Sequence, residues 1–334
     1  MKTLIIFLFA VSTLAAQRSD NPIELGKVEW IRDYDQAIAQ SKATGKPIFL
    51  LFQEVPGCAN CTKYGQDILS HPLMVEAIET EFVPLAIFNN KSGKDRAVLV
   101  QFGEPSWNNP VVRIIDKDGN DLAKRVANFR SRTKIVNTMM DVLQKENKTV
   151  PNYLQLLSQE WIGLETTGEE GFLSMYCFWT GEREIAKIDG VLSTEAGFMH
   201  GREVVKVEYD ETKTDLAKIG NQASKVSCAD AIFTDQVVNT AIPTKKEGKY
   251  RKDSQDKYYL RHTDYQYIPL TDIQQTKINS AIGSKQNPNQ YLSPRQSELL
   301  ASLKSKKIQL DKDFAQAWWE ICLLYTSPSP RDRG

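Results

Sequence analysis

Short apolar runs alternate with helix-like stretches along the first half of the chain. Residues 48–52 and 82–88 are continuously apolar, which is typical of strands buried on both faces of a sheet. A third strand is expected over residues 111–115, where four of five residues are apolar; an Asp-Gly pair after it signals a hairpin turn, with a return strand expected over residues 122–127. Helices are expected around these strands over residues 33–43, 72–80 and 133–145. A further helix is expected after the first strand and should end at residue 68. The order βαβ followed by ββα predicts an α/β domain over residues 25–148.

The remainder of the chain is long enough for a second domain. A polar stretch over residues 145–151 predicts a linker, and residues 152–321 contain neither a low-complexity segment nor an internal repeat. Because a domain usually contains about 100–200 residues, a chain of 334 residues accommodates two of them.

The first residues have the pattern of a secretory signal. Lys2 is followed by an apolar run over residues 4–11 and by small residues over 12–16, which predicts a signal peptide over residues 1–18. The alternative is a buried N-terminal strand. No later segment is long and apolar enough to span a bilayer, so no membrane span is expected after cleavage. Export would place the protein in a periplasm or outside the cell, where disulfides form.

Residues 322–334 differ in character from the rest of the sequence. Residues 322–332 resemble the translated reading frame of a DNA sequencing adaptor. Segments of such an origin are left out of fold reasoning, so we expect the second domain to end at residue 321 and the tail to be artefactual. Of the five cysteines, Cys322 is therefore set aside, and the remaining four are Cys58, Cys61, Cys177 and Cys228.

The charge balance and the cysteine spacing each exclude a class of function. Lys plus Arg and Asp plus Glu both number 42, which argues against a nucleic-acid-binding protein, because such proteins carry a basic surface. Cys58 and Cys61 form a Cys-x-x-Cys pair, and no second Cys or His pair has the spacing that completes a zinc site. Gly-rich phosphate loops are missing, so we predict neither a metal nor an organic cofactor.

The Cys-x-x-Cys pair follows directly after the first predicted strand, where a helix begins. Unpaired amides and the helix dipole favour a thiolate at such a position, so Cys58 is the predicted nucleophile. Cys61 lies one helical turn further on and is the predicted resolving thiol. The alternative is a structural disulfide without turnover.

The motif Val-Pro-Gly-Cys-Ala-Asn-Cys over residues 55–61, with the segment 69–78 after it, resembles a bacterial thioredoxin-like family. Members of that family often carry selenocysteine after Val-Pro-Gly, and here the position holds Cys58. The resemblance implies a thioredoxin-like fold for residues 25–148. It also implies a cis-proline opposite the cysteine pair, for which Pro110 is the candidate.

A second resemblance lies in three segments of the second domain, residues 177–182, 190–198 and 203–210. They resemble methionine sulfoxide reductase A, in which Gly-Cys-Phe-Trp-Gly is followed by a helix, a strand pair and a Glu-Val-Val strand. The resemblance implies a ferredoxin-like α+β domain over residues 152–321. It implies that Cys177 is the nucleophile, that Glu203 is the acid, and that Phe178 and Trp179 form an apolar wall of the substrate pocket.

The second domain departs from that family at several positions. Tyr176 replaces the Gly before the nucleophile, and the insertion that carries a substrate-binding tyrosine between Phe198 and Glu203 is missing. Asp253 and Tyr258 have the spacing of a later Asp and Tyr of the family, but the residues after Tyr258 resemble a different segment. A retained fold without sulfoxide reductase activity is therefore an open alternative.

The chemistry implied for Cys177 is attack of its thiolate on the sulfoxide sulfur, with an acid protonating the departing oxygen. The resulting sulfenic acid needs a second thiol, which either Cys228 or the Cys58–Cys61 pair could supply. The family acts on the S-epimer of the sulfoxide. The expected partners are oxidised methionine in proteins or peptides and an unidentified thiol electron donor.

Two interpretations follow for the whole chain. In the first, an exported enzyme reduces methionine sulfoxide through Cys177, and Cys58 and Cys61 recycle it at the high effective concentration that a tether provides. In the second, the first domain is a disulfide exchanger or redox relay, and the second is a non-catalytic module that binds its client.

Overall fold

The computed structural model describes residues 21–57, 59–127, 131–166, 168–303 and 313–322. The expected signal peptide over residues 1–18, the predicted nucleophile Cys58 and the tail after residue 322 lie outside these ranges. Among the described helices, none is both long and apolar enough to cross a membrane.

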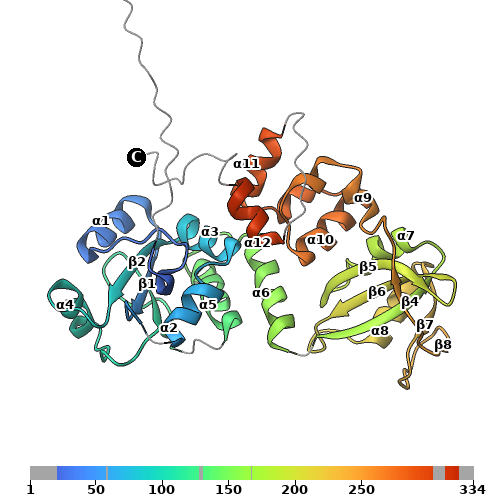
Figure 1. Ribbon diagram of the computed structural model, residues 1–334, viewed down its shortest axis with the longest axis horizontal. Coiled ribbons are helices and arrows are strands. Elements are labelled where there is room, and N and C mark those ends of the chain that lie inside the picture. The colour runs from blue at the N-terminus through green and yellow to red at the C-terminus, as the bar shows by residue number, and fades with distance from the viewer. Residues whose placement is uncertain (1–20, 58, 128–130, 167, 304–312, 323–334) are drawn as a thin grey trace, which may run out of the picture.

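The N-terminal domain is built on three strands (Figure 1). β1 (Ile48–Gln53) lies between β2 (Val83–Phe88), which is parallel to it, and β3 (Val111–Ile115), which is antiparallel. All residues of β1 are buried, as expected for a continuous apolar run in the middle of a sheet. The helical elements of this domain are η1 (Ile23–Leu25), α1 (Tyr34–Thr44), α2 (Ala59–Asp67), α3 (Pro72–Glu81), α4 (Lys94–Gln101) and α5 (Arg132–Lys145).

The ends of α1 follow from local chemistry. The Asp33 side chain accepts a hydrogen bond from the Gln36 amide at 3.1 Å, which satisfies one of the unpaired donors of the first turn. Gly45 ends the helix with φ 67°, a left-handed conformation that glycine adopts without a steric penalty.

The expected return strand over residues 122–127 is not a regular strand. The chain here pairs with β3 through isolated bridges, Val126 opposite Val112 and Asp121 opposite Ile115, and the Leu122 amide donates to the Ile114 carbonyl at 2.8 Å. Lys124 between these bridges is exposed, so this edge segment has little apolar surface to hold it flat against β3.

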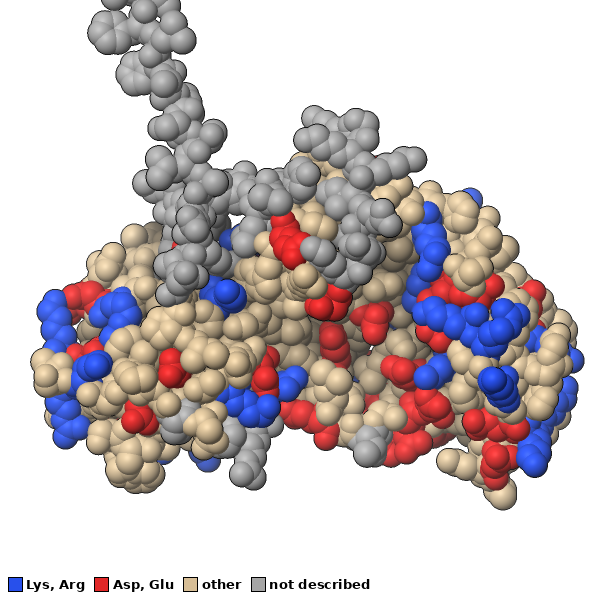
Figure 2. All heavy atoms as spheres, viewed as in Figure 1, with Lys and Arg blue, Asp and Glu red and all other residues tan. Residues whose placement is uncertain are grey.

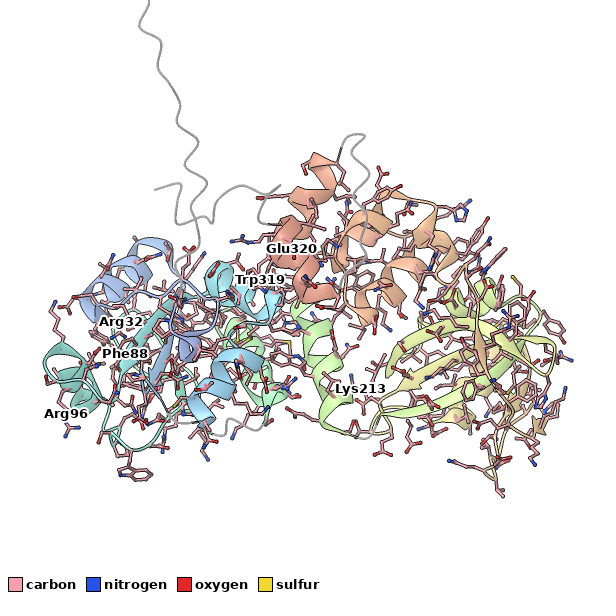
Figure 3. The ribbon with its side chains drawn as sticks, in the orientation of Figure 1. Arg32, Phe88, Arg96, Lys213, Trp319 and Glu320 are labelled. Atoms are coloured by element: carbon pink, nitrogen blue, oxygen red, sulfur yellow. The ribbon has the colours of Figure 1, made fainter. Side chains whose placement is uncertain are left out.

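The sequence also gave no sign of α4. Its two buried residues, Val98 and Leu99, are adjacent and therefore produce no helical periodicity. A tertiary contact holds the helix instead: the Arg32 guanidinium lies 3.4 Å from the centre of the Phe88 ring in β2 and pairs with Asp95 of α4 at 3.0 Å (Figure 3).

The C-terminal region, residues 152–322, contains a six-stranded sheet in the order β8-β7-β4-β6-β5-β9. Its elements are α6 (Asn152–Glu165), β4 (Glu169–Met175), α7 (Phe178–Ile185), β5 (Val191–Met199), β6 (Arg202–Tyr209), α8 (Leu216–Lys225), β7 (Ala229–Phe233), β8 (Thr244–Lys245) and β9 (Arg251–Lys252). The series β4-α7-β5-β6-α8-β7, with antiparallel neighbours in the order β7-β4-β6-β5, is the split βαβ arrangement of ferredoxin-like folds.

The two faces of this sheet are covered differently. One face packs against α7 and α8, through residues such as Leu173, Val205 and Ile219. The opposite face carries a smaller cluster that includes Phe172 and Val204 and is covered by Tyr250. Side chains that alternate along a strand therefore point either to the helices or to this smaller cluster.

A layer of helices stands between the two sheets (Figure 1). It consists of α6 together with α9 (Tyr258–Arg261), η2 (Asp264–Tyr267), α10 (Asp272–Gly283), η3 (Pro288–Tyr291), α11 (Pro294–Ser302), α12 (Phe314–Ala317) and η4 (Trp318–Cys322). One apolar cluster continues from the N-terminal domain into this layer, from Leu73 to Trp161 and Trp318. The buried Glu76 carboxylate of α3 accepts a hydrogen bond from the Arg295 amide of α11 at 2.7 Å. The short connection over residues 146–151 therefore does not separate two independent cores.

Charged side chains of both signs cover the face shown in Figure 2. Lys and Arg gather toward the two ends of the molecule on this face, and Asp and Glu are more frequent near its middle.

Candidate redox sites

The first site lies where β1 leads into α2. Cys61 belongs to α2 and is fully buried. The buried side chain of Gln53, the last residue of β1, donates hydrogen bonds to the Cys61 carbonyl at 3.2 Å and to the Glu24 carbonyl at 2.8 Å. The strand thus fixes the first turns of the helix that carries the cysteine.

The segment before α2 is tightly packed around Gly57. The Gly57 amide donates a hydrogen bond to Glu24 Oε1 at 2.7 Å. A Cβ at Gly57 would lie 2.6 Å from Cys61 Cβ and 2.3 Å from the Glu54 carbonyl oxygen, so no larger residue fits without displacement. Glu24 is buried and bonded to Gly57, and no local pattern pointed to it because α1 and β1 separate it from Cys61.

Asn109 approaches the same site from the other side. The Cys61 thiol donates a hydrogen bond to Asn109 Oδ1 at 2.8 Å, and Asn109 Nδ2 donates to the Ser106 carbonyl at 3.4 Å. The sequence singled out Pro110 as the cis-proline candidate, and the peptide bond between Asn109 and Pro110 is cis. The amide oxygen accepts a proton that exists on the thiol but not on a disulfide, so it favours the reduced form of Cys61.

An open hollow of about 880 Å³ lies in front of this site. Asn60 of α2, Asn109 and Arg96 contribute to its wall, and Trp107 at its rim is 80% exposed. Amide groups and an exposed indole are suited to an extended polypeptide, since both can contact a backbone of any sequence.

The comparisons with known proteins bear on this domain. The family model described as "Thioredoxin-like" matches residues 29–117. The N-terminal domain is thioredoxin-like. Two solved structures are similar to the chain, each with a TM-score of 0.31. The structure titled "DsbH Oxidoreductase" is 21% identical and covers 38% of this chain and 92% of its own, and a thioredoxin from Thermus thermophilus is 20% identical and covers 36% and 89%. No curated protein matches the chain.

The second site lies at the N-terminus of α7, after the central strand β4. Cys177 is the N-cap residue of this helix, and its thiol is free and half-buried. Glu203 projects from the neighbouring strand β6, and its Oε2 accepts a hydrogen bond from the Phe178 amide at 2.8 Å. This bond places the Glu203 carboxyl group at the first amide of α7, one residue after Cys177, and the Glu203 side chain is half-buried.

Aromatic residues follow Cys177 at the start of α7. Phe178 is buried, and its ring packs at 5.5 Å from both Phe198 and Trp179, measured between ring centres. Trp179 stacks on Tyr258 at 4.0 Å, and its buried indole nitrogen has no hydrogen-bond partner among the described residues. Trp179 and Tyr258 therefore form a flat apolar surface, and the buried Phe178 ring packs against Trp179. Periodicity alone gave no sign that Tyr258 stacks on Trp179, because almost 80 residues separate the two.

Buried charges hold α7 in place behind the rings. Lys257 Nζ lies 3.1 Å from the fully buried Glu182 of α7 and 3.2 Å from Asp256. The Asp256 carboxylate also accepts a hydrogen bond from the Ala196 amide of β5 at 3.1 Å. Burial raises the pKa of Glu182 to about 8, whereas the Lys257 charge, acting against burial, lowers the pKa of Asp256 to about 2. Of the two carboxyl groups, Glu182 is therefore the one that more readily carries a proton.

Cys228, the possible resolving thiol, is not presented to Cys177. The Cys228 carbonyl accepts a hydrogen bond from the Tyr176 amide at 3.2 Å, but its buried thiol bonds to the Ala223 carbonyl of α8 at 3.3 Å. Burial raises the pKa of Cys228 to about 11, which disfavours the nucleophilic thiolate.

The structure also does not bring the two candidate redox sites together. α2, which carries Cys61, and α7, which follows Cys177, lie on opposite sides of α6 (Figure 1). The apolar cluster shared by the N-terminal domain and the helical layer opposes a free hinge between them. Direct transfer between Cys61 and Cys177 of one chain would require a large rearrangement.

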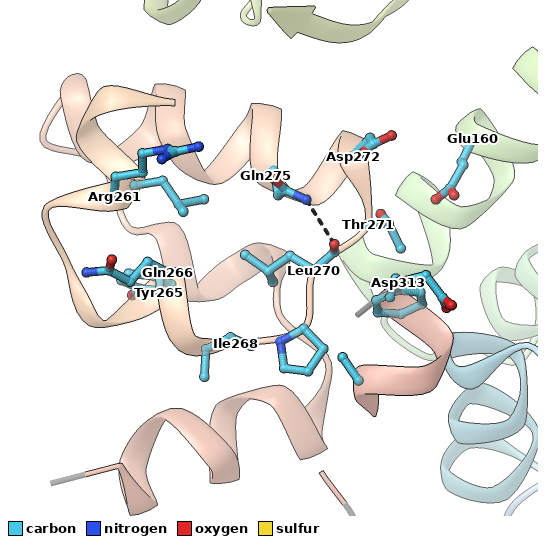
Figure 4. A pocket seen from close by; sticks show the side chains of 14 residues that line it. Glu160, Arg261, Tyr265, Gln266, Ile268, Leu270, Thr271, Asp272, Gln275 and Asp313 are labelled. Carbon is cyan, nitrogen blue, oxygen red and sulfur yellow. Dashed lines mark hydrogen bonds between the residues drawn. The ribbon is translucent and has the colours of Figure 1, made fainter. Parts of the chain in front are cut away.

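A second hollow, of about 640 Å³, lies within the helical layer (Figure 4). Glu160 of α6 faces it, and burial raises the pKa of this carboxyl to about 7. Gln275 Nε2 closes part of its wall by donating to the Leu270 carbonyl at 3.2 Å. None of its lining residues is a cysteine, so it does not extend either redox site.

Proposed function

We propose that the protein is an exported thiol-based reductase with two chemical sites. The thioredoxin-like domain exchanges disulfides through Cys58 and Cys61, and the C-terminal region reduces S-epimeric methionine sulfoxide in proteins through Cys177. Export is proposed on the pattern of residues 1–18 alone.

The observation that carries the second activity is the hydrogen bond from the Phe178 amide to Glu203. The bond holds the Glu203 carboxyl group at the first amide of α7, one residue after the free thiol of Cys177, and so supports a pairing of acid and thiol such as sulfoxide reduction needs. The Cys177 thiolate attacks the sulfoxide sulfur, and Glu203 delivers a proton to the oxygen. The oxygen passes to Cys177 as a sulfenic acid, and the substrate leaves as a thioether, reduced by two electrons.

The flat surface of Trp179 and Tyr258 supports the choice of substrate. A methionine sulfoxide combines a polar S=O group with an apolar methyl group. An aromatic plane beside the carboxyl group contacts the methyl while Glu203 contacts the oxygen. Methionine, which lacks the oxygen, would offer no acceptor to a proton on the carboxyl group.

The second half-reaction regenerates Cys177. A thiolate attacks the sulfenic sulfur and releases water, and a second thiol resolves the mixed disulfide. Because α2 and α7 of one chain lie apart, we propose that Cys58 and Cys61 of another chain, or an external dithiol, supply these electrons.

Reduction of a peptide that contains S-methionine sulfoxide, with dithiothreitol as reductant, tests this function. Wild-type protein and the Cys58→Ser and Cys228→Ser variants should turn over, whereas Cys177→Ser should not, since dithiothreitol replaces only the recycling thiols. Activity equal to wild type in Cys177→Ser, or its complete absence from the wild type, would contradict the proposal.

The second candidate function is disulfide exchange with the C-terminal region as a client-binding module. The open hollow beside Asn60 and Asn109, with the exposed Trp107, favours it. It predicts that the protein reduces or oxidises a disulfide substrate such as insulin, that Cys61→Ser abolishes this, and that no variant reduces methionine sulfoxide.

A further inference from the structure

Arg251 lies on the same face of the sheet as the Cys177 site. Phe198 of β5 is paired with Glu203 of β6 on one side and with Arg251 of β9 on the other. Residues directly opposite each other in a ladder project from the same face. Glu203, Phe198 and Arg251 therefore form a row across three strands, on the face that packs against α7.

Ring contacts connect this row to the reactive cysteine. The Arg251 guanidinium lies 4.6 Å from the centre of the Phe198 ring, and that ring lies 5.5 Å from Phe178, the residue after Cys177. The two contacts together put the guanidinium at most about 10 Å from the Phe178 ring, a distance that about three residues of extended polypeptide span.

The Arg251 side chain has no charged partner among the described residues. It is exposed, and within the described part of the chain its guanidinium forms neither an ion pair nor a hydrogen bond but lies over the Phe198 ring. Its neighbour Lys252 projects to the opposite face and pairs with Glu195 at 2.5 Å and with Asp256 at 3.2 Å. The donors of Arg251 are therefore available to a ligand, whereas those of Lys252 are engaged.

We propose that Arg251 is a specificity-determining residue that binds a carboxylate of the substrate polypeptide, two or three residues from the oxidised methionine. A guanidinium presents paired donors in a plane that matches the two oxygens of a carboxylate, and the Phe198 ring beneath it fixes that plane. This inference rests on the proposed sulfoxide reductase activity.

The test compares three peptides that differ only at the position three residues from methionine sulfoxide, which holds Glu, Gln or Lys. For the wild type, we expect kcat/KM for the Glu peptide to exceed that for the Lys peptide about tenfold, mainly through KM. In Arg251→Gln, the kcat/KM values for the three peptides should lie within about twofold of one another, and the kcat for the Gln peptide should equal that of the wild type. Lys249→Gln, which removes an exposed charge two residues away, is the matched control and should keep the preference.

Two kinds of negative result distinguish the role of Arg251 from the sulfoxide reductase activity itself. If the wild type reduces all three peptides equally, or if Lys249→Gln loses the preference as fully as Arg251→Gln, the role of Arg251 is overturned while the sulfoxide reductase activity stands. If the wild type reduces none of the peptides, the proposed function fails, and the specificity falls with it.

Discussion

The two cysteine sites share a local frame and differ in what surrounds the sulfur. Cys61 and Cys177 both lie at the start of a helix that follows a central strand, β1 in one sheet and β4 in the other. Cys61 is fully buried and contacts an amide oxygen of Asn109. Cys177 is half-buried, with a carboxyl group and aromatic rings nearby.

This difference indicates a division of chemistry. A buried thiol held by an amide suits a sulfur that alternates between thiol and disulfide, since no room is left for a bulky substrate. A half-buried thiol beside an acid and an aromatic plane suits a sulfur that binds and reduces a small polar group. The strand-to-helix junction makes a cysteine reactive, and the surrounding side chains decide what it reacts with.

The largest expected effect comes from removing the acid of the Cys177 site. In Glu203→Gln the side chain can still accept a hydrogen bond from the Phe178 amide, but it cannot deliver a proton to the sulfoxide oxygen. We expect kcat for sulfoxide reduction to fall about 10²–10³-fold, measured with dithiothreitol as reductant. Glu208→Gln on the same strand, where the residue is exposed, should leave the rate unchanged, and an equal loss in both variants would contradict a chemical role for Glu203.

At the Cys61 site the largest effect should come from crowding. Gly57→Ala would place a Cβ 2.6 Å from Cys61 Cβ, so we expect a loss of about 2 kcal/mol in the free energy of unfolding. Urea denaturation should show this loss, and insulin reduction should fall with it. In Gly168→Ala the nearest atom to the new Cβ is 3.5 Å away, so that variant should be nearly neutral. A neutral Gly57→Ala would show that the site is less tightly packed than the structure indicates.

The pH dependence of the free energy of unfolding should show whether the buried Glu182 of α7 carries a proton. Burial raises the pKa of Glu182 from an ordinary value of 4.5 to about 8. A carboxyl group with a raised pKa contributes stability that is fully present below pH 4.5 and is lost as the pH rises through 8. Glu182→Gln should reduce the loss of stability between pH 6 and pH 9 by about 1 kcal/mol or more, as urea denaturation would measure. An unchanged pH profile would mean that Glu182 is ionised throughout.

The smallest predicted effect concerns the Asn109 amide. Asn109→Val removes the acceptor of the Cys61 thiol, which stabilises the reduced form alone. A hydrogen bond contributes about 1 kcal/mol, so the reduction potential of the Cys58–Cys61 pair should become about 20 mV more negative. Equilibration with glutathione measures the potential. Asn108→Val should not change it, because no hydrogen bond of the Asn108 side chain is recorded among the described residues, and a shift toward more positive potential would contradict the assigned orientation of the amide.

Local patterns predicted the frame of both sites. The apolar runs located β1, β2 and β3, and the Cys-x-x-Cys pair after β1 indicated the thioredoxin-like domain that the family match at residues 29–117 confirms. These features depend on consecutive residues, so they can be recognised in one sequence. The helix α4 was not predicted, because it shows no periodicity of its own. Contacts of Arg32 with Phe88 and Asp95 stabilise it instead.

The surroundings of the sulfur atoms were less predictable. Asn109 reaches Cys61 across the sheet, Tyr258 reaches Trp179 from a distant helix, and Arg251 joins the second site only through strand register. Each contact depends on how elements far apart in the sequence pack, which composition and periodicity do not encode. The shared core that separates α2 from α7 was also not predicted, since the polar stretch over residues 145–151 indicated a simple linker.

A single-turnover experiment tests the central claim about Cys177 most directly. The reduced Cys58→Ser/Cys61→Ser protein is mixed with one equivalent of S-methionine sulfoxide peptide, without reductant, and dimedone is added to trap sulfenic acid. We expect one methionine to form per chain and the dimedone adduct to appear on Cys177. Methionine formation without an adduct on Cys177, or no methionine at all, would contradict the account.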